Sequence, residues 1–258
     1  MKAGGSLLGQ VPFTLAINDH LGTSQLKGRT SLDCPADGGR LKALIFDVDG
    51  TLYEQAPVRR AMLSRLVRTH LTSPVQGLFI FRALQAYRNA QEVLRTTGHE
   101  SDDIASAQLL LAAKQVGAHV DIISSSVARW MEQEPLPAVA RAVRKGIIEF
   151  LREAKRYGLQ LAVYSDYPAD RKLVALGMAE FFDVVVTAQD PEIQRFKPDP
   201  TGLEVTLQRL GVRNDEAIYI GDRPEVDAIA AARAGVRHFI LDKTHAVDQL
   251  SQFLIPRS

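Results

Sequence analysis

The 258-residue chain contains a single cysteine, Cys34, so no intramolecular disulfide can form. Because disulfides are typical of secreted proteins and rare in the reducing cytoplasm, we expect a cytoplasmic protein. Cys34 has no base close to it in the sequence, which argues against a catalytic thiol. Long apolar runs are also missing: residues 109–113 are too few to cross a membrane, and the first residues lack the apolar core of a secretory signal.

An excess of charge of either sign is absent as well. The 31 lysines and arginines face 30 aspartates and glutamates, which gives a formal net charge of +1. Such a protein lacks the broad basic surface that attracts nucleic acid or an acidic membrane, so we expect neither as a partner. The 46% hydrophobic and 24% charged residues are typical of a soluble globular protein. The sequence leaves open whether the protein is a monomer or a homodimer.

The sequence divides into parts of different texture. Residues 1–40 are rich in Gly, Ser, Thr and Asp without sustained periodicity, and we expect a poorly ordered extension with at most an edge strand over 11–17. Residues 53–137 have a helical pattern, whereas 41–52 and 138–258 alternate between strands and helices. This alternation predicts an α/β fold: a Rossmann-like parallel sheet with helices on both faces and a helical bundle inserted after its first strand.

Apolar residues at helical spacing predict four helices in the inserted part: one ending before Pro74, one over about 75–95, one ending near Gly117 and one over about 120–132. A bundle at the ligand-binding edge of a sheet is well placed to act as a lid. Its first half carries seven arginines and two glutamates. We expect most of these arginines to be solvated, but contact with an anionic substrate stays open for Arg59 and Arg60, which lie nearest the first strand.

The remaining core elements follow from the same patterns. They are a helix over 139–154, strands over 159–164, 181–187, 217–220 and 237–241, a helix that starts at Asp199-Pro200, and a helix over 225–234.

The most informative stretch is LIFDVDGT, residues 44–51, in which an apolar run ends in two aspartates, a glycine and a threonine. The run predicts a buried strand of a parallel sheet, and its alternation places Asp47 and Asp49 on the same side. Two carboxylates that lose hydration together need a compensating charge, for which Mg²⁺ with its preference for oxygen ligands is suited. At this point, an Asp-Gly turn that only ends the strand is an equal alternative.

Later strand ends carry further polar groups, namely Ser165, Lys197 and the pair Asp222 and Asp227. The carboxyl ends of parallel strands meet at one edge of a sheet, so these groups can converge on the first-strand aspartates. Together they suit phosphoryl transfer, which needs an attacking carboxylate, a second carboxylate that moves protons, and a metal and a lysine that neutralise the phosphoryl oxygens. Taken singly, each residue has an alternative interpretation: Ser165 as a helix cap, Lys197 as an exposed loop cation, Asp222 as a turn residue and Asp227 as an acid at a helix start.

In this order, the motifs DVDGT (47–51), Ser165 after a hydrophobic strand, KPDP (197–200) and GDRPEVD (221–227) resemble the four motifs of the haloacid dehalogenase (HAD) superfamily. The resemblance covers roughly residue 42 to the C-terminus and points to the branch of phosphoglycolate phosphatases and β-phosphoglucomutases. It implies a Rossmann-like core, a C1-type helical cap formed by the inserted bundle, and Mg²⁺ as cofactor.

The resemblance also implies a role for each matching residue. Asp47 is then the nucleophile and a metal ligand. Asp49 is the general acid and base, and binds the metal through its backbone carbonyl. Thr51, Ser165 and Lys197 are expected around the phosphoryl group.

For the metal, the resemblance implies Asp222 as a further ligand. Asp227 would support it directly or indirectly, and Glu225 is a competitor for that role because the family allows several spacings.

Asp49 separates the chemistries of the family. Dehalogenases lack this acid, and phosphonatase-like members place a lysine in the cap, where this chain has only Lys114, late and within a predicted helix. The resemblance therefore implies a Mg²⁺-dependent phosphatase that hydrolyses a small phosphorylated metabolite through an aspartyl-phosphate intermediate. A phosphosugar mutase of the β-phosphoglucomutase type is the first alternative. A non-catalytic protein that binds a phosphorylated ligand on the same scaffold is the second.

Overall fold

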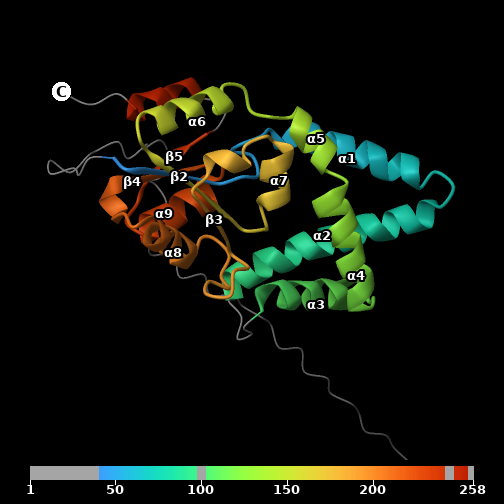
Figure 1. The fold of residues 1–258 in the computed structure, drawn as a ribbon. Coiled ribbons are helices and arrows are strands. Elements are labelled where there is room, and N and C mark those ends of the chain that lie inside the picture. Colours follow the sequence, from blue (N-terminus) through green and yellow to red (C-terminus); the bar gives the residue numbers. More distant parts are fainter. Residues whose placement is uncertain (1–40, 98–102, 242–246, 255–258) are drawn as a thin grey trace, which may run out of the picture.

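A computed structural model describes residues 41–97, 103–241 and 247–254 of the chain (Figure 1). The extension expected over 1–40, with its possible edge strand and Cys34, lies outside these residues. One sheet contains the strands β1 (Ala43–Phe46), β2 (Gln160–Ser165), β3 (Val184–Thr187), β4 (Ala217–Gly221) and β5 (Arg237–Ile240). All neighbours are parallel, in the order β3-β2-β1-β4-β5. The predicted α/β class is confirmed.

Helices cover both faces of this sheet, as Figure 1 shows. On one face, Phe46 and its neighbours pack under α6 (Ile147–Arg156) and η5 (Val247–Phe253). On the other face, Ile45 and its neighbours pack under α8 (Thr201–Leu210) and α9 (Ile229–Arg233). Each large apolar side chain buried in this way contributes about 1.5–3 kcal/mol. Because β1 is buried on both faces, its sequence is apolar throughout and not alternating.

The inserted part between β1 and α5 is helical, as predicted. It contains α1 (Gln55–Thr69), α2 (Pro74–Thr97), α3 (Ile104–Val116) and α4 (Val120–Val127), and α4 continues as the π-helical turn η1 (Ala128–Gln133). The side chain of Asp103 caps α3 by accepting a hydrogen bond from the Ser106 N–H at 3.0 Å. Gly117 ends this helix at φ 66°, a conformation that glycine adopts without strain. None of the helices in the described part of the chain is long and apolar enough to span a bilayer.

One predicted helix is wrong. The stretch 139–154 contains two helices, α5 (Leu136–Arg141) and α6, which are separated by a turn with Gly146 at φ 82°. In this turn, Arg144 donates to the backbone carbonyls of Gly50 and Thr51, the latter at 2.9 Å. The break therefore ties the region between the two helices to the loop that follows β1.

Smaller elements complete the core. They are α7 (Asp170–Ala175), η2 (Ala179–Phe181), η3 (Asn214–Glu216) and the π-helical η4 (Pro224–Ala228). The strand expected over 181–187 is shorter than predicted, because residues 179–181 form the turn η2 and β3 begins at Val184. The helix expected over 225–234 begins one residue earlier and changes from η4 to α9 at Ile229.

Candidate active site

The polar groups predicted at the strand ends meet at one edge of the sheet. Asp47 follows β1, Ser165 ends β2, Lys197 lies in the loop after β3, and Asp222 follows β4. Each of these four residues is 25 to 118 positions away from the next one along the chain. The parallel sheet nevertheless places their strand ends side by side. The arrangement is the one expected for ligand binding at the carboxyl edge of a doubly wound sheet.

Lys197 is the centre of the charge network. Its Nζ donates to Asp47 Oδ1 at 2.6 Å and to Asp227 Oδ1 at 2.8 Å, and lies 3.0 Å from the Tyr219 hydroxyl. The lysine side chain is only 3% exposed. Burial lowers the pKa of Lys197, but the charges of Asp227 and Asp47 outweigh this effect and hold the pKa well above its usual value. The lysine is therefore a buried cation shared by two carboxylates.

The positive charge of Lys197 does not fully compensate the negative charge of the carboxylates around it. Burial raises the pKa of Asp47 to about 8, with Lys197 opposing this shift and Asp227 and Asp222 adding to it. Burial and the charge of Asp227 raise the pKa of Asp222 to about 6. The buried Oδ1 of Asp222 has no hydrogen-bond partner among the described residues. Oxygen atoms of Asp47, Asp222 and Asp227 lie within 4.8 Å of one another, so the donor set fits a divalent cation with oxygen ligands.

Asp227 holds this cluster together from inside the protein. Its Oδ1 accepts from Lys197 and from the Tyr219 hydroxyl, and its Oδ2 accepts from the backbone N–H groups of Asp222 and Arg223 at 3.1 and 3.0 Å. Glu225 instead forms an ion pair with Arg223 at 3.0 Å, and its side chain is 64% exposed. Of the two competing acids, Asp227 is the one in the cluster.

Gly50 is required by the close approach of two segments. A Cβ atom at this position would lie 1.9 Å from Asp222 Oδ2, and Gly50 has φ +102°, which L-residues rarely adopt. The glycine of the DVDGT motif thus lets the loop after β1 come against the end of β4.

Asp49 has two partners that the sequence does not reveal. Lys172 of α7 donates to both of its carboxylate oxygens at 2.6 and 2.7 Å, and the Tyr53 hydroxyl donates to Oδ1 at 2.5 Å. Burial raises the pKa of Asp49, but the charge and hydrogen bond of Lys172 outweigh it and lower the pKa below its usual value. The Asp49 carbonyl accepts from the Gln55 side chain at 2.6 Å, which leaves this oxygen a second lone pair.

Thr51 and Ser165 are both buried, but they face different groups. The Thr51 hydroxyl lies 3.4 Å from Asp47 Oδ2 and points toward that carboxylate. Ser165 lines the cavity described below, and its Oγ accepts from the Tyr167 N–H at 3.3 Å. Ser165 is therefore the hydroxyl that is open to a ligand.

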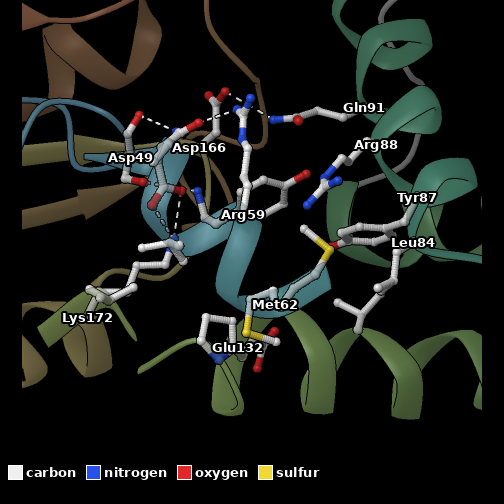
Figure 2. A pocket seen from close by; sticks show the side chains of 18 of the residues that line it. Asp49, Arg59, Met62, Leu84, Tyr87, Arg88, Gln91, Glu132, Asp166 and Lys172 are labelled. Atoms are coloured by element: carbon white, nitrogen blue, oxygen red, sulfur yellow. Dashed lines mark hydrogen bonds and ion pairs between the residues drawn. The ribbon is translucent and has the colours of Figure 1, made fainter. Parts of the chain in front are cut away.

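Asp166, the residue after Ser165, connects the core to the cap. Its carboxylate accepts from the Lys197 backbone N–H at 3.0 Å, from the Gln91 side chain at 3.1 Å and from the guanidinium of Arg95. Gln91 and Arg95 come from α2. These contacts fix the end of α2 against the loop that carries Lys197, and Figure 2 shows Gln91 extending toward Asp166.

A cavity of about 980 Å³ lies between the cap and the sheet edge. The core contributes Asp47, Asp49, Ser165, Lys197 and Lys172, whereas the cap contributes apolar and basic side chains of α1, α2 and η1. Figure 2 shows Tyr87 and Arg88 on the α2 side of this cavity, opposite Asp49 and Lys172. A ligand with one end at Asp47 would extend under the cap.

Comparison with known proteins identifies the class. The profile of the haloacid dehalogenase-like hydrolases matches residues 41–235. The chain therefore belongs to this family of hydrolases, as its motifs predicted.

Curated relatives cover most of the chain. Validoxylamine A 7'-phosphate phosphatase from Streptomyces hygroscopicus subsp. limoneus is 29% identical over 82% of this chain and 90% of its own length. Phosphoserine phosphatase from Thermus thermophilus is 29% identical over 79% of this chain and 89% of its own length. Phosphoglycolate phosphatase from Rhodospirillum rubrum is 29% identical over 76% and 77%, respectively.

Solved structures share the fold. A HAD phosphatase from Thermococcus onnurineus superimposes with a TM-score of 0.56 at 21% identity, covering 83% of this chain and 98% of that one. A 2-haloacid dehalogenase from Pseudomonas syringae pv. Tomato gives 0.57 at 22% identity, with the same coverage. Phosphatases and dehalogenases of the family thus match this chain almost equally in fold, and the chemistry has to be argued from the site.

Proposed function

We propose that the protein is a Mg²⁺-dependent phosphatase that hydrolyses a small phosphorylated metabolite through an aspartyl-phosphate on Asp47. One observation carries this proposal: the buried Asp47 carboxylate is paired with Lys197, borders the Asp222 and Asp227 carboxylates, and lines the cavity under the cap. The names of the relatives, all phosphatases of small phosphorylated compounds, support it. The carboxylate of Asp49 beside the same cavity supplies the second acid that a phosphatase needs.

The metal-binding residues of the proposal are Asp47 and Asp222 through their carboxylates and Asp49 through its carbonyl. Asp227 supports them indirectly, because four hydrogen bonds already engage its two oxygens. A bound Mg²⁺ would supply positive charge to the phosphoryl oxygens and would offset the repulsion among these carboxylates.

In the first half of the reaction, a carboxylate oxygen of Asp47 attacks phosphorus and the bond between phosphorus and the ester oxygen breaks. Asp49 gives its proton to the leaving oxygen, so the alcohol departs neutral. Lys197 and Ser165 hold the phosphoryl oxygens, and Thr51 orients Asp47. In the free protein, Lys172 keeps Asp49 ionised, but the negative charge of an arriving phosphoryl group would raise its pKa and favour the protonated form.

In the second half, Asp49 as a carboxylate takes a proton from water. The resulting hydroxide attacks phosphorus and the bond from phosphorus to Asp47 breaks, which releases inorganic phosphate and restores both carboxyl groups.

Phosphate release from a panel of phosphate esters with Mg²⁺ tests the proposal. Asp47→Asn should reduce the rate by about 10³-fold or more, because the nucleophile is removed. The matched control is Asp121→Asn, whose side chain on the cap surface is 83% exposed. It should leave the rate unchanged.

The intermediate can be tested directly with Asp49→Asn. p-Nitrophenyl phosphate has a leaving group that needs little protonation, so the first half can proceed while the second is slowed. Intact-protein mass spectrometry should then show one added phosphoryl group. Phosphate release that survives Asp47→Asn would overturn the nucleophile assignment. Isomerisation of sugar phosphates without phosphate release would support the mutase, and binding without turnover would support a non-catalytic scaffold.

A further inference from the structure

Two arginines of the cap line the cavity from different helices. Arg59 comes from α1 and Arg88 from α2. Figure 2 shows Arg88 reaching into the cavity from α2, opposite the Asp49 and Lys172 pair. All four neighbouring arginines are exposed, but Arg60 on α1 and Arg82 on α2 do not line the cavity, whereas Arg59 and Arg88 do. The structure thus separates Arg59 from Arg60, which the sequence alone could not do.

Most cations of the cavity are already neutralised by carboxylates. Lys197 is paired with Asp47, Lys172 with Asp49, Arg95 with Asp166 and Arg223 with Glu225. Among the described residues, Arg59 and Arg88 of the cap and Arg171 of α7 form no ion pair with a carboxylate. The guanidinium of Arg59 donates to the neutral amide oxygen of Gln55, and within the described ranges Arg88 forms no hydrogen bond or ion pair.

The two guanidinium groups act on one another. Burial lowers the pKa of Arg88, and the charge of Arg59 lowers it further. Arg171 of α7 also lines the cavity, but its charge is not among the strongest acting on Arg88. The charge of Asp49 acts on Arg88 in the opposite direction, but Asp49 is itself paired with Lys172, so the two cations remain unfavourable neighbours in the free protein. An anionic group placed between them would relieve both the repulsion and the loss of hydration.

The remaining wall of the cap limits what else such a ligand can carry. Met62, Leu84 and Trp130 line it, so its surface is largely apolar. Glu132 of η1 is the acidic exception. It has no hydrogen bond or ion pair with either arginine in the described part of the chain, and its charge acts on Tyr87 instead.

We propose that Arg59 and Arg88 form a subsite for a second anionic group of the substrate, at the end away from the phosphoryl group that is transferred. The substrate class is then a phosphate monoester that also carries a carboxylate or a second phosphate. Guanidinium groups suit both, because their paired N–H donors match two oxygens of one anion. The proposal rests on the proposed function, since it assigns the other end of the substrate to Asp47.

The test compares three matched esters: ethyl phosphate, phosphoglycolate and ethylene glycol bisphosphate. Each ester is used with a two-carbon and a four-carbon chain, so that the distance between the two anionic groups does not by itself decide the outcome. We expect kcat/KM of the wild type to be higher for the doubly anionic esters by about tenfold to a hundredfold, the value of a hydrogen-bonded charge pair. Whether the carboxylate or the bisphosphate set is preferred identifies the second group.

The arginine variants test the residues. We define the ratio as kcat/KM for the doubly anionic esters divided by kcat/KM for the alkyl phosphates, which have an uncharged tail. Arg88→Gln and Arg59→Gln should bring this ratio down toward one. Arg82→Gln and Arg60→Gln are the matched controls on the same helices, and should keep the wild-type ratio. Thermal unfolding of all four variants checks that the fold is intact. A wild type without preference, or an unchanged ratio in both Arg88→Gln and Arg59→Gln, would overturn the subsite.

Direct binding keeps this result separate from a failure of the proposed function. Asp47→Asn cannot turn over substrate by the proposed route, so its affinity for phosphoglycolate and for ethylene glycol bisphosphate can be measured by calorimetry. Adding Arg88→Gln should weaken binding of the preferred ligand by about tenfold or more. If no ester is hydrolysed but this loss is seen, the phosphatase proposal fails and the subsite stands. If esters are hydrolysed but this loss is absent, only the subsite fails.

Discussion

The sharpest stability prediction concerns Lys197. Lys197→Met keeps most of the side-chain volume but removes the ammonium group that Asp47 and Asp227 share at 2.6 and 2.8 Å. With the lysine side chain only 3% exposed, water cannot replace the lost charge. Removing one partner of a buried ion pair costs about 3–5 kcal/mol. The pKa of Asp47 is already raised to about 8, so in metal-free buffer near pH 7 this group can take up a proton and Asp227 is the charge left unpaired. We therefore expect a loss of about 3–5 kcal/mol.

The loss should depend on pH in one direction. In the wild type, burial raises the pKa of Asp227, but Lys197 outweighs it and holds the pKa below its usual value. This stability is present above the unfolded-state pKa and is lost as the pH falls through the folded-state value. Without Lys197, burial leaves the pKa of Asp227 raised, so the variant regains stability as the carboxylate protonates. The gap between the two proteins should therefore narrow on acidification from about pH 7 to about pH 5.

Urea unfolding followed by circular dichroism, with a chelator present, measures this gap. The control is Lys155→Met, which breaks the ion pair between Lys155 and Asp183. The side chains of these two residues are 32% and 40% exposed, respectively. The surface pair should cost no more than about 1 kcal/mol. Adding Asp227→Asn to Lys197→Met should recover part of the loss, since one unpaired charge is removed. A loss for Lys197→Met no larger than for the control, or a gap that widens on acidification, would refute the reasoning.

Two further predictions concern the loop after β1 and its partner helix. Gly50→Ala should weaken Mg²⁺ binding, measured by calorimetry, and destabilise the fold by about 1–3 kcal/mol, because its Cβ would lie 1.9 Å from Asp222 Oδ2 at φ +102°; an unchanged Mg²⁺ affinity would contradict this. Lys172→Met should lower kcat by about 10²-fold with little change in KM, because Asp49 loses the group that positions it, and Lys172→Arg should restore part of kcat. A change confined to KM would show that Lys172 only contacts substrate.

The convergence of motif residues was predictable because it depends on topology. A buried apolar run followed by acids, repeated along an alternating chain, requires parallel strands whose carboxyl ends share an edge. Asp47, Lys197 and Asp222 could therefore be placed near one another from the sequence. Their detailed partners could not, since the choice of Asp227 over Glu225 depends on how η4 turns its side chains inward.

Other parts of the site depend on tertiary packing that leaves no local pattern. Lys172 reaches Asp49 only because α7 packs beside the loop after β1, across 123 positions of sequence. Asp166 and Arg95 are 71 positions apart and meet where α2 docks on the core. The split between α5 and α6 was missed for a related reason. Apolar residues continue at helical spacing through the break, while the contacts of Arg144 with the β1 loop stabilise the turn.

The charges of the site differ between its two ends, and this difference explains how one cavity can hold an extended anion. At the sheet edge, four carboxylates (Asp47, Asp49, Asp222 and Asp227) are contacted by two ammonium groups, those of Lys197 and Lys172. The excess there is negative, so a phosphoryl group would be repelled unless a divalent cation accompanied it. At the cap end, Arg59 and Arg88 leave an excess of positive charge. Under the proposed function and the proposed subsite, a substrate that is anionic at both ends would meet a metal-assisted site at one end and a metal-free site at the other, which would favour it over an ester with a neutral tail.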